Sequence, residues 1–499
     1  MRPRLRLKLR LARPLVATGA LLLTFGCAVG PDFKRPQPES PSSWSPAASS
    51  ASADAPSPAR SDAPFDGRDW WTVFRDPLLD RLVEEANAQN LDLQTAALRI
   101  AAARAQREQA GGKLYPEVSG FGTAARTRLS ENGILGSSGG GSSGGGAPSP
   151  LTNLFQVGFD ALWELDLWGG TRRGVEAATA DVESAERARN EAQASLCAEV
   201  ARAYLSVRGA ERQRAIAREN IETEQRLLAL VDSQKRAGLA SQSEVAAQAT
   251  QLRAAQAQLP TLEQALALAR SQVAQLLALP PGALNERLAA PAAVAALPPE
   301  VPVGLPGELL RRRPDVRRRE AELHAAAARV GVNEAKLFPS VTLAAAGGLQ
   351  ATHASDLTDW ASRFWFGGAL ISVPIFQGGQ LQAQVKLAGI DAQRAALAYR
   401  QTVLGAFHDA DNALVAYGYE QQHAAALDKQ LADARRSRDL ARERWQSGLA
   451  AFIDVLDAQR VVEQTEQQLE QSTLAASINL VALFKALGGG WDEEEHAGR

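Results

Sequence analysis

The sequence predicts a mainly α-helical protein with a small β part, built as an internal duplication. Three observations lead to this prediction: long helical stretches without proline, short segments that alternate apolar and polar residues, and motifs that recur at offsets of about 210 to 220 residues. The composition agrees, because alanine and glutamine are plentiful and aromatic residues make up only 6% of the chain. Such a composition favours long helices over β-sandwiches.

The N-terminus has the features of an export signal. Residues 2–13 are rich in arginine, and the apolar run "PLVATGALLLTFG" stops at Cys27. That run is too short to span a bilayer permanently, so we interpret residues 1–26 as a signal peptide. A cysteine directly after a small residue indicates lipoprotein processing, with Cys27 as the lipidated first residue of the mature chain. The alternative is an ordinary signal peptide followed by an unpaired cysteine.

Similar motifs occur twice in the same order. "GKLYPEVSGFG" (112–122) resembles "AKLFPSVTLAA" (335–345), and "KRAGLASQSEV" (235–245) resembles "WQSGLAAFIDV" (445–455). We therefore expect a lipidated N-terminal tether at 27–68, a first repeat at 69–290, a second repeat at 291–491 and a disordered tail at 492–499. Only Cys27 and Cys197 are cysteines, which excludes a disulfide framework or a zinc cluster built from them.

Residues 155–167 give the strongest strand signal. Odd positions are apolar, whereas the even positions include Asp160, Glu164 and Asp166. Similar segments at 118–123, 341–345 and 365–375 give four strands per chain. Strands of this type suit an outer-membrane barrel with apolar side chains outside and a polar lumen, to which we assign the three acidic residues. The alternative is a soluble β-sandwich.

Two segments connect these strands in pairs. The Gly/Ser-rich stretch "GSSGGGSSGGGAPSP" (136–150) and the segment 347–359 are expected to be long hairpin loops on the extracellular side. Four strands cannot close a transmembrane barrel, for which about eight is the practical minimum. Because an open edge in lipid leaves backbone groups unpaired, copies of the chain must combine. From this argument alone, two, three or four copies would serve.

The rest of the chain is predicted to be helical. Long helices at 171–236 and 380–447 are each followed by a short turn and a return helix, at 242–278 and 449–487. At ~1.5 Å per residue the long helices reach about 100 Å. Shorter helices are expected at 76–111 and 308–336, and Pro260 should kink or interrupt its helix. The alternative is a solvent-exposed antiparallel coiled coil that contacts nothing else.

No catalytic motif was found, so the protein is not expected to be an enzyme or to hold a cofactor or metal. The sequence has no H-E-x-x-H, G-x-S-x-G or P-loop pattern. "HDAD" (408–411) could suggest a metal site but fits a solvated helix turn better. The arginines at 311–313 and 317–319 fit a helix start better than nucleic acid, and the formal net charge is only −2.

The motifs resemble those of the TolC-like outer membrane factors, and most closely the NodT-type lipoproteins of resistance-nodulation-division efflux systems. The resemblance is carried by "CAVGPDFKRP" (27–36), "WELDLWGGTRR" (163–173), "PIFQGG" (374–379), "VLDAQR" (455–460), "LFKALGGGW" (483–491) and the long motif at 309–343. It implies a lipid-anchored homotrimer with one 12-stranded outer-membrane barrel, continuous with a long α-helical barrel across the periplasm. The implied partners are a periplasmic adaptor protein and an inner-membrane pump, together with outer-membrane lipid.

The resemblance also implies roles for two short motifs. The turns "RAGLAS" and "SGLAAF" would form the periplasmic tips that meet the adaptor through Gly238, Leu239, Gly448 and Leu449; the alternative is ordinary helix-stop chemistry. The motif "FIDVLDAQR" would carry the periplasmic gate, with Asp457 and Arg460 as charged contacts, Ile453 as an apolar ring and Asp454 nearby. The first repeat has Ala247 where the second has Asp457, so only one copy would carry the gate.

The expected function is that of a passive exit duct for small molecules in a tripartite efflux system. The alternatives are an exit channel for secreted polypeptide and a lipid-anchored coiled-coil tether. The sequence does not indicate the cargo.

Overall fold

The computed structural model describes residues 28–45, 59–60, 67–128, 151–290, 297–298 and 300–491. They divide into two compact units, which we call the strand unit (within Met1–Arg35, Ala101–Glu183 and Ala321–Leu397) and the helical unit (within Pro36–Ile100, Ser184–Glu320 and Ala398–Arg499). Cys27, the signal peptide, the Gly/Ser-rich loop and the tail at 492–499 lie outside the described residues. In the described part of the chain, no helix is both long enough and apolar enough to cross a membrane.

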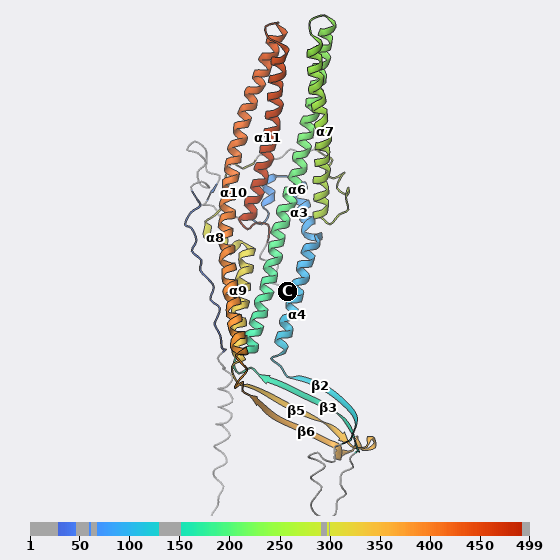
Figure 1. Ribbon diagram of the computed structural model, residues 1–499, viewed down its shortest axis with the longest axis vertical. Coiled ribbons are helices and arrows are strands. Elements are labelled where there is room, and N and C mark those ends of the chain that lie inside the picture. Colours follow the sequence, from blue (N-terminus) through green and yellow to red (C-terminus); the bar gives the residue numbers. More distant parts are fainter. Residues whose placement is uncertain are drawn as a thin grey trace, which may run out of the picture. The chain divides into compact units, whose positions relative to one another are not determined.

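The strand unit contains a four-stranded antiparallel sheet, as the alternation predicted (Figure 1). Its strands are β2 (Glu117–Arg128), β3 (Leu151–Leu165), β5 (Ser340–Ala351) and β6 (Arg363–Ser372), in the order β2-β3-β5-β6. Several predicted limits were wrong: β2 continues past 123 to Arg128, β3 begins before 155 at Leu151, and β6 ends before 375 at Ser372. β3 ends at Leu165, before Asp166, and β5 continues to Ala351, so that the connection to β6 begins later than residue 347 and contains two short 3₁₀ turns.

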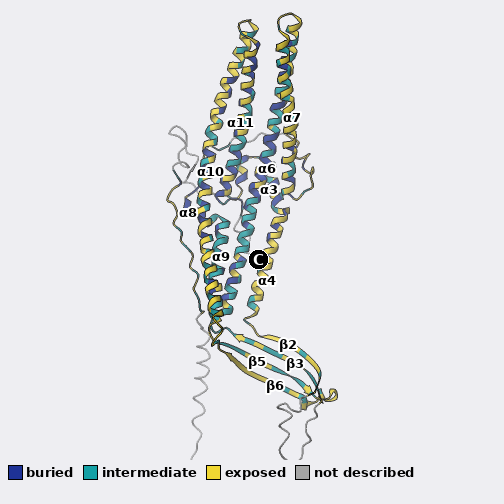
Figure 2. Ribbon diagram, in the orientation of Figure 1, coloured by how far each residue is buried: buried dark blue, intermediate teal, exposed yellow. Residues whose placement is uncertain are grey.

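The strand register places Phe159 and Trp365 on the same face of the sheet, whereas Phe366 and Leu370 lie on the other face with Asp160 and Glu164. Phe159 pairs with Gly120 on one side and Gly347 on the other, and Gly347 pairs in turn with Trp365. Residues that are directly opposite one another share a face. Phe159 is 69% exposed and Trp365 is 85% exposed, so these apolar side chains are uncovered within the described chain. Most of β6 has the colour of exposed residues in Figure 2.

The helices occur as matched pairs. α6 (Gly170–Arg236) and α10 (Gln380–Gln446) have 67 residues each, and α7 (Gln242–Leu276) and α11 (Phe452–Ala486) have 35 each. α4 (Leu91–Gly112) and α9 (Pro314–Ala335) both have 22 residues. These equal lengths in the two halves support the internal duplication. α7 continues through Pro260 as one helix, so the expected interruption is absent.

Two helices that the sequence predicted as continuous are each broken. The segment 76–111 divides at Asn90 into α3 (Pro77–Gln89) and α4, because Asn90 takes an extended backbone and its side-chain oxygen accepts hydrogen bonds from the amides of Asp92 and Leu93. The segment 308–336 divides at Arg313 into α8 (Pro306–Arg312) and α9. Arg313 is extended because the proline that follows it disfavours a helical backbone.

Part of the predicted tether is packed against the helical unit. Trp44 is buried, and its indole nitrogen donates to the backbone oxygen of Gly304 at 3.0 Å. Ser45 donates from both its amide and its hydroxyl to Asp411. β1 (Ala59–Arg60) pairs in parallel with β4 (Val301–Pro302). The sequence analysis expected an extended tether here, and it missed these contacts because they join residues that lie more than 200 positions apart.

Candidate functional site

The two helical hairpins of the helical unit end in turns of the same construction. Gly238 and Gly448 have φ of 76° and 70°, a backbone that glycine adopts at low cost. Leu239 donates its amide to the oxygen of Gln234 at 2.9 Å, and Leu449 donates to that of Arg444 at 2.8 Å, the bond that closes a Schellman motif. Leu239 is 80% and Leu449 72% exposed, so each turn presents one apolar side chain to its surroundings.

The helices that follow the two turns start differently. At α7, Ser241 and Glu244 form a reciprocal capping box, with each side chain bonded to the backbone of the other residue. At α11 the equivalent residue, Ala451, has no side-chain oxygen, so only the carboxylate of Asp454 contributes, by accepting from the Ala451 amide at 3.1 Å. The structure therefore gives Asp454, a predicted gate residue, a capping role.

An apolar cluster holds the hairpins together near their turns. Val231 of α6 packs with Phe452, Val455 and Leu456 of α11, and all four side chains are buried. Ile453 lies between these residues in the sequence but is about half exposed. α11 therefore places Ile453 on a different side from its buried residues, as the prediction of an apolar gate residue requires.

Asp457 and Arg460 lie on an exposed part of α11 and contact one another. Arg460 Nη1 donates to Asp457 Oδ1 at 3.3 Å, and both side chains are more than half exposed. With the amide of Gln251 turned so that its oxygen faces the guanidinium, Gln251 of α7 also accepts from Arg460 Nε at 2.7 Å. The single chain shows an ion pair within α11 and a bridge from α11 to α7.

A buried polar cluster that the sequence analysis missed lies further along the same helices. Gln248 of α7, which is fully buried, donates from Nε2 to the backbone oxygen of Glu224 at 3.2 Å and to the carboxylate of Glu224. Gln459 donates to Glu463 at 2.9 Å. Burial, together with hydrogen bonding and repulsion from Glu463, raises the pKa of Glu224 to about 7.

The position of Glu224 in this polar cluster corresponds to an apolar position in the second repeat. Ala434 occupies the position 210 residues after Glu224, and it packs with Leu431 and Val462. A comparison of the two repeats at this offset could have indicated the cluster, because a charged residue in the first repeat corresponds to a small apolar residue in the second. The same comparison did single out Asp457 against Ala247.

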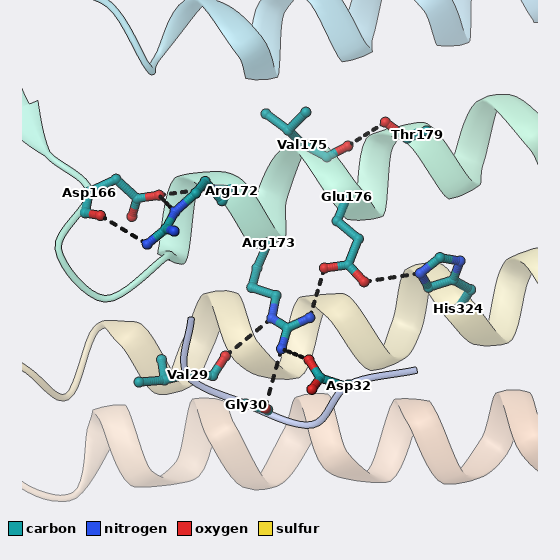
Figure 3. Close-up of polar contacts among 10 residues, drawn as sticks. All are labelled: Val29, Gly30, Asp32, Asp166, Arg172, Arg173, Val175, Glu176, Thr179 and His324. Carbon is teal, nitrogen blue, oxygen red and sulfur yellow. Dashed lines mark hydrogen bonds and ion pairs between the residues drawn. The ribbon is translucent and has the colours of Figure 1, made fainter. Parts of the chain in front are cut away.

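The three acidic residues assigned to the barrel lumen do not share one environment. Asp160 and Glu164 lie on β3, on the face opposite Phe159 and its apolar neighbours. Asp166 lies past the end of β3, where its carboxylate accepts from the amides of Thr171 and Arg172 and pairs with the Arg172 guanidinium (Figure 3). It thus caps the N-terminus of α6, where a negative charge is favourable. The strand prediction placed it wrongly.

Residues of the motif at 408–411 and of the arginine-rich run form ion pairs and hydrogen bonds within the chain. Asp409 pairs with Arg313 at 3.1 Å, and Asp411 accepts from Ser45. Arg313 also pairs with Asp315 at 2.7 Å. Among the described residues, no three His, Cys, Asp or Glu side chains gather as a metal site would need.

Comparisons with known proteins match this architecture. The sequence model of the outer membrane efflux protein family matches residues 82–279 and 305–489. The pyoverdine export outer membrane protein OpmQ of Pseudomonas putida is 34% identical over 88% of this chain and 92% of its own length. Nodulation protein T of Rhizobium leguminosarum bv. trifolii is 28% identical over 96% of this chain and 97% of its own.

Among solved structures, the outer-membrane channel OprN superposes with a TM-score of 0.85 at 33% identity, covering 93% of this chain and all of that one. The chain belongs to the outer membrane efflux protein family, the TolC-like family that its motifs predicted.

Proposed function

We propose that this chain is the outer-membrane exit channel of a tripartite efflux system. The observation that carries the proposal is the sheet of the strand unit, which has an uncovered apolar face and two outer strands, β2 and β6, with no further strand beside them among the described residues. In water such a sheet would invite aggregation. In a lipid bilayer the apolar face is solvated by acyl chains, and only the open edges need partners.

Three copies of the chain satisfy those edges. β6 of one copy would pair with β2 of the next, so that three four-stranded sheets close into one barrel of 12 strands. A closed ring of identical copies is the usual symmetry of a homo-oligomer. In this barrel Asp160 and Glu164 would face the lumen, because they lie on the face opposite Phe159. Asp166 would lie at the end of the barrel as part of the α6 cap.

The helical hairpins would continue the duct into the periplasm. Leu239 and Leu449, at the exposed turns formed by Gly238 and Gly448, would contact a periplasmic adaptor, and the adaptor would connect the duct to an inner-membrane pump. Three-fold symmetry would bring three copies of Asp457, Arg460 and Ile453 together as the gate. In this arrangement Arg460 would exchange its partner within the chain for one in the next copy when the gate closes.

The remaining assignments follow from export to the outer membrane. Residues 1–26 would be removed as a signal peptide, and Cys27 would be lipidated at the start of the segment 27–68. The two repeats would comprise residues 69–290 and 291–491. The matched family regions, 82–279 and 305–489, fall inside these limits. The duct would perform no bond chemistry and hold no cofactor.

The cargo class is proposed to be small molecules. This rests on the names of relatives, which include a pyoverdine export protein and a toluene efflux protein of Pseudomonas putida. These relatives cover 88% and 96% of this chain. A polypeptide exit channel and a structural tether are the competing functions.

Reconstitution of the purified protein into planar bilayers tests the proposal. A heat-resistant trimer that conducts in discrete steps is expected, with no pump or adaptor present in the bilayer. A monomer, or a trimer that leaves the bilayer silent, would favour the tether. Uptake and export of a small fluorescent solute by cells that carry or lack the gene then separates small-molecule efflux from polypeptide export.

A further inference from the structure

A single arginine of the strand unit binds the chain's own N-terminal segment. Arg173 lies in the first turns of α6 and donates four hydrogen bonds (Figure 3). Its Nε donates to the backbone oxygen of Val29 at 3.2 Å, and Nη2 donates to the oxygen of Gly30 at 3.3 Å and to Asp32 Oδ1 at 2.6 Å. Its Nη1 donates to Glu176 Oε2 at 2.8 Å. Three of the four acceptors thus belong to residues 29–32.

The Arg173 side chain is buried and charged in this contact. Its side chain is only 6% exposed. Burial alone would lower the pKa of the guanidinium, but Asp32 and Glu176 raise it above its ordinary value, so the group is charged throughout. Glu176 also contacts His324 Nε2 at 3.0 Å, and the His324 ring stacks on Phe33 with centroids 4.4 Å apart. Residues 29–33 are therefore held at both ends.

The backbone of the segment lies directly against two helices. A Cβ added to Gly331 of α9 would come within 2.7 Å of the oxygen of Val29, and one added to Gly30 would come within 2.4 Å of the Gly331 Cα. The amide of Val29 donates to the oxygen of Trp168 at 3.0 Å. Such close backbone approach requires glycine at both positions. The surface beside Arg173 is thus shaped for this segment.

The arrangement fixes where the preceding residue must lie. A Cβ added to Gly169 would come within 2.8 Å of the Cα of Ala28, so Ala28 lies between the end of β3 and the start of α6. Ala28, the first described residue, therefore lies beside the turn that joins β3 to α6. Consecutive Cα atoms are about 3.8 Å apart across a trans peptide bond.

The second repeat offers a natural comparison. At the position that corresponds to Arg173 in "WGGTRR", the motif "QGGQLQ" of the second repeat has Gln382. The chain has only one N-terminal segment to hold, and only the repeat that contacts it has the arginine. This difference favours a role in binding the segment over a general role in starting the long helices.

We propose that Arg173 is a positioning residue that binds residues 29–32 and so places the acylated Cys27 level with the end of the sheet. The acyl chains on Cys27 and the adjacent end of the sheet then lie in the same leaflet of the membrane. This placement raises the yield of inserted trimers. This inference rests on the proposed lipidation and channel function.

Epistasis between Arg173 and Cys27 tests the inference in the full-length protein. Arg173→Gln and Asp32→Asn are made in two backgrounds: the acylated chain, and a Cys27→Ser chain exported behind a non-lipoprotein signal peptide. The readouts are palmitate incorporation and the fraction of outer-membrane protein that runs as a heat-resistant trimer. Arg329→Gln, which removes an exposed ion pair with Asp181 in the same unit, is the matched control.

In the acylated background, Arg173→Gln should retain palmitate but lower the trimer fraction severalfold, Asp32→Asn should lower it less, and Arg329→Gln should leave it unchanged. In the Cys27→Ser background, Arg173→Gln should cause no further loss. An equal loss in both backgrounds would reduce Arg173 to a purely structural role and overturn the inference. Absence of palmitate in the unaltered chain would overturn it too, while bilayer conductance would still test the channel function separately.

Discussion

Glu224 of α6 lies near Glu463 of α11 inside the helical unit, and burial, together with this second carboxyl group, raises the pKa of Glu224. Glu224 is buried, and Gln248 of α7 and Arg460 of α11 face the pair from the neighbouring surfaces. Burial and the neighbouring carboxyl group therefore favour the protonated form of Glu224, whose pKa is raised to about 7.

Stability is expected to decrease as the pH rises from about 4.5 to about 7. In the unfolded chain Glu224 loses its proton near its ordinary pKa of 4.5, whereas in the folded chain it keeps the proton up to about 7. Between these values the folded state binds more protons, so the free energy of unfolding falls with rising pH. Thermal unfolding midpoints of the detergent-solubilised protein between pH 4.5 and 8 measure this.

Glu224→Gln should flatten that pH dependence, because an amide of the same size does not titrate. Glu222→Gln, at an exposed position one half-turn away, is the control and should preserve the slope. An unchanged slope in Glu224→Gln would show that another group is responsible.

Substitution of either member of the exposed pair on α11 should open the duct. We expect Asp457→Ala and Arg460→Ala to raise single-channel conductance, since each removes one half of the proposed charged ring. The free energy of unfolding should change by less than about 1 kcal/mol, because exposed ion pairs contribute little to stability. Conductance that matches the unaltered channel in both variants would remove the gate assignment.

Adaptor binding should depend on the two exposed leucines at the turns. Leu239→Ser and Leu449→Ser should each weaken binding about tenfold or more, since a buried leucine contributes about 1.5–3 kcal/mol. Ser447→Ala changes a neighbouring exposed side chain and should bind normally. Affinity is measured with a purified periplasmic adaptor that binds the unaltered protein, and normal binding by both leucine variants would contradict the assignment.

Asn90→Ala should destabilise the helical unit by about 1–3 kcal/mol. The substitution removes the cap of α4 and the hydrogen bond that Asn90 Nδ2 donates to the oxygen of Leu276 at 3.0 Å. Gln94→Ala, at an exposed position of α4, is the control. Urea unfolding followed by circular dichroism gives both values, and equal stability of the two variants would contradict the prediction.

The sequence was sufficient for the elements that periodicity dictates. Alternation identified all four strands, and the bounds of α6, α7 and α10 agree with the prediction within about two residues, because long uninterrupted patterns leave few alternatives. The turns at Gly238 and Gly448 were also predicted, since glycine followed by leucine is a local helix-stop signal.

Features that depend on distant residues could not be predicted in the same way. Glu224 and Glu463 are far apart in the sequence, and neither has a local pattern that indicates the other. Asn90 interrupts a helical pattern only because its side chain makes three hydrogen bonds: with the amides of Asp92 and Leu93 and with the backbone oxygen of Leu276. Arg173 is part of the family motif at 163–173, but that motif does not indicate its partners. These partners, at 29–32, are brought to α6 only by the fold.

The unequal starts of α7 and α11 make the duplicated hairpins mechanically different. Ser241 and Glu244 secure one return helix with two reciprocal bonds, whereas Ala451 leaves the other with a single bond from Asp454. When force is applied to both turns, the first turn of α11 should therefore unfold before the first turn of α7. The return helix that contains Asp457 and Arg460 thus starts with one capping bond fewer than its counterpart in the first repeat.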